Sequence, residues 1–247
     1  MSRPNATRAD VCAVACADLF IDAGEILVSP MGTIPTIGAR LARLSFAPDI
    51  VLSDGEAYLS AEAVPLGAQS PLEGWLPYRS VFDVVAWGRR HVVMGANQID
   101  GYGTQNISCI GDHAAPSRQL FGARGAPGNT VNHRTSYWVP RHSSRVFVER
   151  VDMASGVGYD RALGAAGRFH DLHRVVTNLA VLDFRTPDRR MRLVSVHPGV
   201  SMANVVAATG FELAVADVAM TRIPSSDEFR LLDFIDPQRI REREVPA

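Results

Sequence analysis

No lysine occurs in the chain, and all 25 of its basic residues are arginine. This absence excludes Schiff-base catalysis by a lysine, anchoring of pyridoxal phosphate and the lysine of a Walker-type phosphate loop. Cysteine is also scarce, with three among 247 residues, so the chain has neither a disulfide framework nor a paired Cys-x-x-Cys site. Cys12 and Cys16 are four residues apart on a stripe typical of an apolar helical face, and we expect them to pack in the core.

Long runs of one kind are missing as well. No apolar run is long enough to cross a membrane, and no basic segment followed by an apolar block precedes the first helical pattern. The formal net charge is −1 and no long basic run is present, which argues against a nucleic-acid surface. We therefore expect a cytoplasmic protein that binds neither membranes nor nucleic acids.

The composition that remains is that of a globular enzyme. Hydrophobic residues make up 47% of the chain and charged residues 21%, which is enough for one large core. Helical patterns alternate with short apolar runs, and this predicts a single α/β domain over residues 1–247. Helices are expected at 7–20, 36–44, 201–208 and 226–240. Strands are expected at 25–29, 50–53, 145–151, 175–184, 192–196 and 211–216.

Three stretches have less regular patterns. Residues 81–94 fit either a pair of strands or a helix followed by a buried strand, and residues 61–77 are expected to be loop with a short helix. Residues 111–142 are irregular and rich in glycine, asparagine, arginine and histidine. Idle connections of that length are uncommon, so we expect this segment to line a functional site.

The sequence Ser-Asp-Gly-Glu at 53–56 is the most informative stretch. It follows an apolar run at 50–52 and places Asp54 and Glu56 in a turn at the carboxyl end of a predicted strand. Ligands of open α/β sheets bind beyond this end of the strands, and two carboxylates there suit proton transfer or nucleophilic attack. The alternative is a solvated turn, because aspartate and glycine are common turn formers.

Three other stretches could contribute to a site. Residues 95–106 place glycines and amides at a strand end, where backbone N–H groups can approach a ligand, although a hairpin explains them equally well. Residues 122–129 form a glycine-rich loop around Arg124, typical of an oxyanion hole or of a flexible surface loop. Residues 132–142 suit a carboxylate-recognition patch or an interface rim.

Two further site types lack support in the sequence. His170 and His173 have a spacing that a metal could use, but no third ligand is evident, so no metal site is expected. No G-x-S-x-G elbow is present, which leaves a serine hydrolase unsupported.

Four of these segments together resemble the beta subunit of the family I coenzyme A transferases. The order of the motifs along the chain is the same, and the similarity extends from about residue 24 to residue 216. The segments are M-G-T-I-P-T at 31–36, S-D-G-E at 53–56, G-A-N-Q-I-D with a later glycine and asparagine at 95–106, and H-P-G-V with T-G-F at 197–211. The resemblance implies an open, mostly parallel sheet flanked by helices, as in that family.

One departure from the family pattern matters for function. The transferases form a glutamyl-coenzyme A thioester in this turn, whereas position 54 here carries the shorter aspartate. A nucleophile displaced by a methylene loses its near-attack geometry. The altered turn, Arg124 and residues 132–142 are similar to a divergent branch of the family, the beta subunits of actinobacterial hydrolases that open a steroid ring.

That resemblance implies hydrolytic carbon–carbon cleavage of a cyclic β-keto acyl-coenzyme A in cholesterol degradation. It implies a partner alpha subunit of the same fold in an α2β2 assembly, an acyl-coenzyme A substrate and no separate cofactor. It assigns catalytic roles to Asp54, Glu56 and Arg124. The substrate-binding candidates are Asn97, Gln98, Gly122, Gly125, Asn129, His133 and Trp138.

Two alternatives stay open at this point. The chain could be the beta subunit of a true coenzyme A transferase that uses Asp54 as the nucleophile. It could instead be a non-catalytic subunit that only completes the pocket of its partner.

Overall fold

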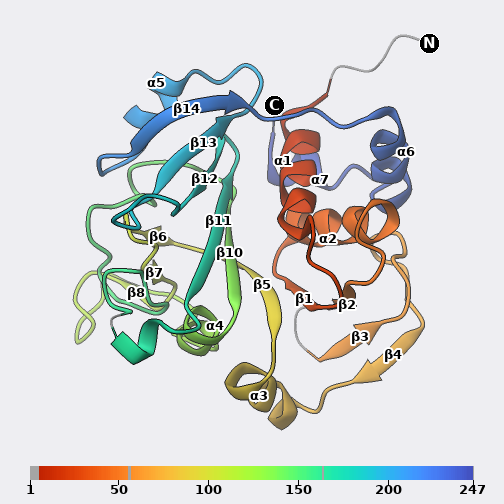
Figure 1. The fold of residues 1–247 in the computed structure, drawn as a ribbon, viewed down its shortest axis with the longest axis horizontal. Coiled ribbons are helices and arrows are strands. Elements are labelled where there is room, and N and C mark those ends of the chain that lie inside the picture. The colour runs from red at the N-terminus through yellow and green to blue at the C-terminus, as the bar shows by residue number, and fades with distance from the viewer. Residues whose placement is uncertain (1–5, 55–56, 163, 247) are drawn as a thin grey trace.

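The computed structural model describes residues 6–54, 57–162 and 164–246. A ten-stranded sheet with the order β14-β13-β12-β11-β10-β5-β1-β2-β3-β4 runs through it (Figure 1). Its strands are β1 (Leu27–Pro30), β2 (Val51–Ser53), β3 (Tyr58–Ser60), β4 (Leu72–Trp75), β5 (Arg90–Gly95), β10 (Arg134–Val139), β11 (Asp171–Thr177), β12 (Ala180–Asp183), β13 (Arg192–Val196) and β14 (Ala214–Met220). Two small hairpins pair β6 (Gln98–Ile99) with β7 (Gln105–Asn106) and β8 (Cys109–Ile110) with β9 (Arg118–Gln119). The α-helices are α1 (Arg8–Ala17), α2 (Thr33–Ser45), α3 (Tyr78–Trp87), α4 (Ala126–Asn132), α5 (Met202–Ala207), α6 (Ser226–Ile235) and α7 (Arg241–Glu244), and two 3₁₀ turns span Asp18–Phe20 and Gly164–Gly167.

The centre of the sheet is parallel and its outer strands are mixed. Strands β2, β1, β5, β10 and β11 all run in one direction, each paired in parallel with its neighbour. Antiparallel pairs add β3 and β4 on one side and β12 and β13 on the other, and β14 pairs in parallel with β13. The predicted fold class, an open and mostly parallel sheet flanked by helices, is therefore confirmed.

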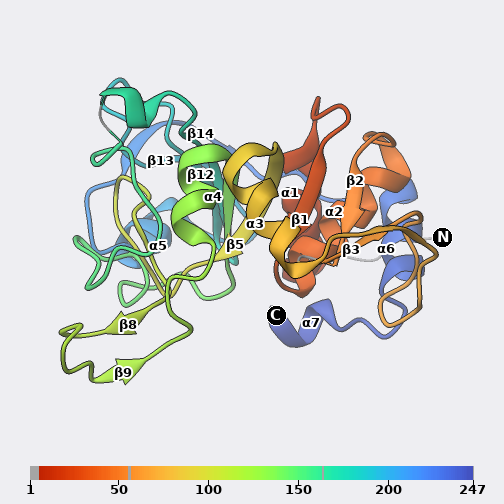
Figure 2. The same cartoon turned by 90° about the horizontal axis from the view of Figure 1, so that it is seen from below.

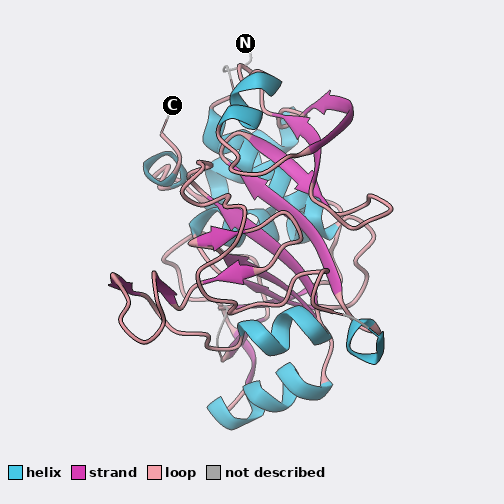
Figure 3. Cartoon of the chain, turned by 90° about the vertical axis from the view of Figure 1, so that its left-hand side faces the viewer, coloured by secondary structure: helices cyan, strands magenta, loops and turns pink. Residues whose placement is uncertain are grey.

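Side chains that alternate along the central strands supply two cores, one on each face of the sheet. Val93 of β5 and Trp138 of β10 belong to the core under α1, α2 and α6, whereas Val92 and Tyr137 face the other core. Helices α1, α2, α6 and α7 pack together on the first face, and α4 contacts β10, β11 and α3. The helices lie outside the twisted layer of strands (Figure 3), and α3 lies beside α4 (Figure 2).

Local sequence explains how the first two helices form and pack. Thr7 caps α1, and its side chain and that of Asp10 exchange hydrogen bonds with the backbone in a capping box. Gly38 of α2 sits against α1 so closely that an added Cβ would lie 2.7 Å from the Cβ of Cys16. Cys12 and Cys16 are fully buried, as expected, and all three cysteines are free thiols.

The largest difference from the predicted elements lies in residues 111–142, which are not an irregular connection throughout. They contain α4 and the whole of β10, a strand at the middle of the sheet. Its sequence, Arg-Thr-Ser-Tyr-Trp-Val, lacks alternation because both faces of the strand are covered and two small hydroxyl residues are buried with the aromatics. A central strand with this composition has no periodic signal.

Other predicted elements also change. No strand forms over 145–151, where an isolated bridge from Phe147 to Ile99 ties down a loop. The expected strand at 175–184 is the hairpin of β11 and β12, which reverses at Asn178 and Leu179. Residues 61–77 contain β4 rather than a short helix, whereas 81–94 hold α3 followed by β5, one of the two predicted alternatives.

None of the helices in the described part of the chain is both long enough and apolar enough to cross a bilayer.

Candidate functional site

The predicted carboxylate turn lies at the carboxyl ends of the parallel strands. The neighbouring strands β1, β2 and β5 all end on this side, and each is followed by a polar or glycine-containing segment. These segments contain Gly32 before α2, Asp54 after β2, and Asn97 after β5. The backbone N–H of Met31 donates to the Val93 carbonyl over 2.9 Å and holds the ends of β1 and β5 together. The chain continues from β1 on one side of the sheet and from β5 on the other, and this is the strand topology beyond which α/β proteins bind ligands.

Asp54 is exposed at the end of β2, and its carboxylate is tied to its own turn. Oδ1 accepts hydrogen bonds from the backbone N–H of Ala57 at 2.9 Å and of Tyr58 at 3.1 Å. The Asp54 N–H donates to the Tyr58 carbonyl at 3.1 Å, where β3 begins. The carboxylate is therefore held against the β2–β3 turn rather than projected on a long side chain. Glu56, the second acid of the motif, lies outside the described residues.

The amide residues after β5 have different positions. Asn97 is exposed, and its backbone N–H donates to the Asn106 carbonyl at 3.0 Å. Gln98 is buried, and its side chain bonds with Asp152 and Asn106: Nε2 donates to Asp152 Oδ2 at 3.0 Å, and Oε1 accepts from Asn106 Nδ2 at 2.7 Å. Gln98 thus supports the strand-end hairpin from beneath, while Asn97 faces outward.

The same hairpin holds a buried aspartate, Asp100. Its Oδ1 accepts from the backbone N–H groups of Tyr102 at 3.0 Å and Thr104 at 2.9 Å. Burial raises the pKa of Asp100, and these hydrogen bonds oppose the rise. The acid of the 95–106 motif therefore shapes a turn of the backbone.

Arg124 is exposed in the turn before α4. Its backbone φ is +51° and that of Gly122 is +82°, so the loop makes a left-handed bend that glycine adopts at little cost. Gly125 is the N-cap residue of α4, and no side chain caps that end. Asn129, one turn into the helix, is buried: its Oδ1 accepts from Arg90 Nη2, and its Nδ2 lies 3.2 Å from the sulfur of Met94. Arg124 and Asn129 therefore belong to one segment but differ in access to ligand.

Trp138 is buried and bonded to a residue that the sequence did not single out. Its Nε1 donates to Glu244 Oε1 at 2.6 Å, and Glu244 Oε2 accepts from the backbone N–H of Ile34 at 3.2 Å. Glu244 comes from α7, at the other end of the chain, and it places a carboxylate at the N-terminus of α2, where the helix dipole stabilises negative charge. No local signal marks Glu244, because its sequence surroundings, Arg-Glu-Arg-Glu, resemble a solvated helical turn.

His133 lies at the opposite, amino ends of the strands, directly before β10, and is 2% exposed. Burial and the nearby Arg90 guanidinium lower the pKa of His133 to about 4, so its ring is neutral at pH 7. The structure thus brings Asp54 and Asn97 to the carboxyl ends of the parallel strands and places His133 at their amino ends.

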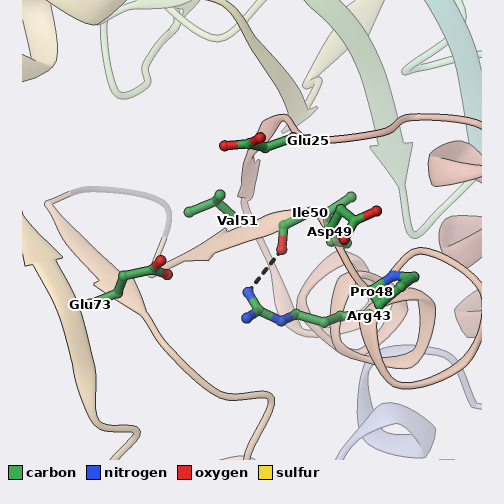
Figure 4. Close-up of a pocket in the computed structure, with 7 residues that line it drawn as sticks. All are labelled: Glu25, Arg43, Pro48, Asp49, Ile50, Val51 and Glu73. Atoms are coloured by element: carbon green, nitrogen blue, oxygen red, sulfur yellow. Dashed lines mark hydrogen bonds between the residues drawn. The ribbon is translucent and has the colours of Figure 1, made fainter.

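Two cavities lie at the amino ends of strands. One, of about 330 Å³, is lined by the acids Glu25, Asp49 and Glu73 beside Arg43, whose Nη1 donates to the Ile50 carbonyl at 2.8 Å (Figure 4). The other, of about 310 Å³, includes His133 in its lining. Asp54 and Arg124 line neither cavity. Among the described residues, no group of three or more histidine, cysteine, aspartate or glutamate side chains could hold a metal ion.

Comparison with known proteins decides the family. The IpdB subunit of the cholesterol ring-cleaving hydrolase of Rhodococcus jostii RHA1 is 57% identical over 243 residues, which cover 97% of this chain and 96% of that protein. The chain belongs to the IpdB family of cholesterol ring-cleaving hydrolase subunits. No protein-family model matches the chain.

Structural comparison agrees with membership of the IpdB family. A chain in the crystal structure of Rhodococcus jostii RHA1 IpdAB superposes with a TM-score of 0.95 at 56% identity, covering 99% of this chain and 100% of that one. A wider relationship reaches the glutaconate coenzyme A-transferase of Acidaminococcus fermentans, one polypeptide of which is 29% identical over 94% of each chain. Its crystal structure superposes with a TM-score of 0.82, covering 96% of this chain and 98% of that one. The predicted resemblance to coenzyme A transferases, and to the ring-opening branch in particular, is therefore confirmed.

Proposed function

We propose that the chain is the IpdB-type subunit of a heteromeric hydrolase that opens a ring of a cholesterol-derived acyl-coenzyme A. The observation that carries this proposal is the 57% identity over 97% of the chain to a protein of that name. The superposition on a chain of the two-subunit IpdAB supports a second, different subunit as the partner of this chain as well. An α2β2 assembly in the cytoplasm completes the proposal, and the three free thiols fit a reducing compartment.

The proposed reaction is hydrolysis of a carbon–carbon bond in a cyclic β-keto acyl-coenzyme A. A base removes a proton from water, the oxygen bonds to the ring ketone carbon, and the second electron pair of the C=O bond moves onto the ketone oxygen. That pair re-forms the C=O bond as the bond to the thioester α-carbon breaks, and the electron pair of the broken bond moves onto the α-carbon as a thioester enolate. A proton returned to the α-carbon gives an open chain that carries a new carboxylate and the intact thioester. Coenzyme A is part of the substrate, and the reaction needs no further cofactor.

The geometry of Asp54 supports water as the attacking group. A glutamate in this turn could reach a thioester, whereas the shorter aspartate is drawn back onto two backbone N–H groups at 2.9 and 3.1 Å. We assign Asp54, together with Glu56, to holding water or shaping the pocket. The principal base then comes from the partner subunit.

Arg124 is our candidate for stabilising the enolate. It is exposed on a bent glycine loop, so a substrate can approach both its guanidinium and the backbone N–H groups around Gly122 and Gly125. A fixed donor aimed at a developing negative charge contributes about 3 kcal/mol to catalysis. Asn97, the exposed amide after β5, would orient the thioester, with Gln98 supporting it.

The test uses the chain purified together with its partner subunit. We expect Arg124→Ala to lower kcat/KM for ring opening roughly 100-fold, because one charge-stabilising donor is lost. Arg230→Ala is the matched control, since Arg230 is an exposed arginine of α6 and should leave the rate unchanged. Equal rates for the parent and Arg124→Ala would remove Arg124 from the mechanism.

Chemical trapping separates the proposal from a coenzyme A transferase. Borohydride or hydroxylamine added during turnover captures an acyl-enzyme only if a carboxylate of this chain forms a thioester or anhydride. We expect no adduct on Asp54 or Glu56. The double variant Asp54→Ala with Arg124→Ala tests the non-catalytic role, which predicts unchanged activity and substrate binding.

A further inference from the structure

Two of the three tryptophans of the chain lie on its surface, in the segment that follows the carboxylate turn. Trp75 of β4 is 62% exposed and Trp87 at the end of α3 is 87% exposed, whereas Trp138 is buried. Three other rings between residues 58 and 87 are exposed as well: Tyr58, Tyr78 and Phe82. We call these five exposed rings the aromatic surface. Tryptophan is highly buried on average, so such a concentration marks a surface that another molecule covers.

The rings follow one another from β3 through β4 to α3. Tyr58 and Trp75 are directly opposite each other in the antiparallel pair of β3 and β4, which places their side chains on the same face of the sheet. Strand β4 ends at Trp75, and α3 begins shortly after it at Tyr78. The rings of Tyr78 and Phe82 meet edge to face, with 5.1 Å between their centroids. Figure 1 shows β3, β4 and α3 along the lower border of the molecule.

Helix α3 is held in place although none of its residues is buried. Asn132 Nδ2 of α4 donates to the Val85 carbonyl at 3.0 Å, and a Cβ added at Gly128 of α4 would lie 2.5 Å from Val85 Cγ1. Packing on α4 therefore fixes α3 and still leaves Tyr78 and Phe82 exposed to solvent. Because most helical stability comes from packing of an apolar face, α3 needs a further surface to cover these rings.

The charges around the aromatic surface cancel. Two acids and two arginines occur between residues 72 and 89: Glu73, Arg79, Asp83 and Arg89. A surface with no net charge does not attract nucleic acid or anionic lipid. Aromatic side chains are enriched, and charged ones depleted, at the core of protein–protein interfaces. The chemistry therefore fits the apolar surface of another protein chain.

The area of the rings is large enough for a stable contact. They are between 46% and 87% exposed, and an aromatic side chain has about 150–250 Å² to bury, so together they expose roughly 600 Å². A stable interface buries about 800 Å² of each partner. The rings alone thus supply most of one side of a stable interface.

The aromatic surface is continuous with the turn that holds Asp54. The backbone N–H of Tyr58 donates to Asp54 Oδ1 at 3.1 Å. Leu76, between β4 and α3, donates its N–H to the Ala57 carbonyl at 2.7 Å. A subunit that brings a base to a substrate at Asp54 therefore approaches the residues that carry these rings.

We propose that the aromatic surface is the docking surface for the second, different subunit of the heteromer, with Trp75 and Phe82 as its central anchors. The partner covers β4 and α3, and its base reaches the substrate from the same side as Asp54. This inference rests on the proposed function, in which the principal base comes from the partner subunit.

Hydroxyl-radical footprinting of the assembled protein, analysed by mass spectrometry, tests whether the aromatic surface is covered. Phe169 is the reference, because it is 63% exposed and lies outside this surface. Tryptophan and tyrosine react with the radical at least as fast as phenylalanine, so exposed rings would be oxidised at least as much as Phe169. We expect Trp75 and Tyr78 to be oxidised about tenfold less, because rings at the centre of an interface are shielded from water. Oxidation equal to that of Phe169 overturns the proposal, and so does protection that appears only when an acyl-coenzyme A is added.

Photo-cross-linking in the assembled protein identifies the occupant. The variant Phe82→benzoylphenylalanine should cross-link to the partner subunit. A cross-link to a second copy of this chain overturns the assignment, and so does the absence of any cross-link between chains.

Competition for the partner measures what the rings contribute to docking. The partner subunit, tagged and limiting, is produced together with equal amounts of the parent chain and Phe82→Ala, and the masses of the captured chains give their ratio. We expect the parent to exceed Phe82→Ala about tenfold or more, because truncation of a central ring weakens an interface by at least that factor. Phe234→Ala is the matched control, since Phe234 on α6 is 49% exposed and Phe82 is 51% exposed. Equal capture of Phe82→Ala and Phe234→Ala overturns the docking surface.

The rate of ring opening, measured separately on the same complexes, distinguishes the two proposals. A complex that assembles through the aromatic surface but opens no ring refutes the proposed function and leaves the docking surface standing. An active complex in which Trp75 and Tyr78 are oxidised as readily as Phe169 refutes the docking surface alone.

Discussion

Arg241 anchors the C-terminal segment, and replacing it tests how that segment stabilises the fold. The side chain is 1% exposed, although it carries a full charge. Its Nε donates to Asp10 Oδ1 of α1 at 2.7 Å, and its Nη1 donates to Asp236 Oδ2 at 3.1 Å and to the Asp236 carbonyl at 3.2 Å. Asp10 and Asp236 are equally buried, so the three residues form one charged network between the two ends of the chain.

The expected loss in the free energy of unfolding depends on the partners that Asp10 and Asp236 keep in Arg241→Ala. Removing one partner of a buried ion pair costs about 3–5 kcal/mol, because the other charge stays buried without compensation. Here the aspartates keep some partners: Asp10 Oδ2 still accepts from the Thr7 N–H, and Asp236 still accepts from the N–H groups of residues 240 and 241. We therefore expect a loss near the lower end, about 3 kcal/mol, or roughly 150-fold in the unfolding equilibrium.

The measurement is urea unfolding of the assembled protein at one fixed concentration, followed by tryptophan fluorescence. Arg239→Ala is the matched control, since Arg239 is half exposed and pairs with Glu242 on the same short segment. Exposed pairs contribute about 0–1 kcal/mol, so the control should stay near the parent. Equal losses in Arg241→Ala and Arg239→Ala would show that the buried network does not stabilise the fold as argued.

Two further predictions concern the stability of the fold, one at the close-packed Gly103 and one at the buried ring of His197. Gly103→Ala should lower the free energy of unfolding by about 2–4 kcal/mol, because an added Cβ would lie 2.5 Å from a leucine side chain at a φ of +84°. Gly67→Ala, with a φ of +81° and nothing within 4 Å, should show the smaller backbone cost alone, and denaturation of both variants compares them. Burial lowers the pKa of His197 to about 4, so the unfolded chain takes up a proton first as the pH falls, and stability should decline from about pH 6.5 toward 4. A pH series of unfolding curves checks this; His197→Gln should flatten the decline, and a matching decline in His197→Gln and in the exposed-residue control His113→Gln would refute it.

In the candidate site, local sequence predicts the position of Asp54 but not its neighbours in space. The strand-end position of Asp54 follows from an apolar run before a turn, and that signal lies within a few residues. The neighbours of Asp54 in space are set by pairing between β1, β2 and β5, whose residues are far apart along the chain. The single-domain organisation and the roles assigned to the site residues remain predictions.

His133 and Trp138 show what local sequence misses. They stand five residues apart in one polar and aromatic stretch, which predicted a shared recognition patch. Because the extended strand β10 separates them, the two residues lie at opposite ends of the strands. His133 lines the cavity at the amino ends, and Trp138 donates to Glu244.

The starts of α1, α5 and α6, the strand-end position of Asp54 and the family could be inferred from the amino-acid sequence alone, since caps, apolar runs and motif order are short-range or linear properties of the chain. The Thr7–Asp10 capping box is such a property. By contrast, the position of Glu244 at the N-terminus of α2, and the meeting of basic residues from two strands in one cavity, became visible only in the folded molecule. Strand order, strand direction and the docking of the last helix depend on contacts between distant residues, and such contacts leave no periodic trace in the sequence.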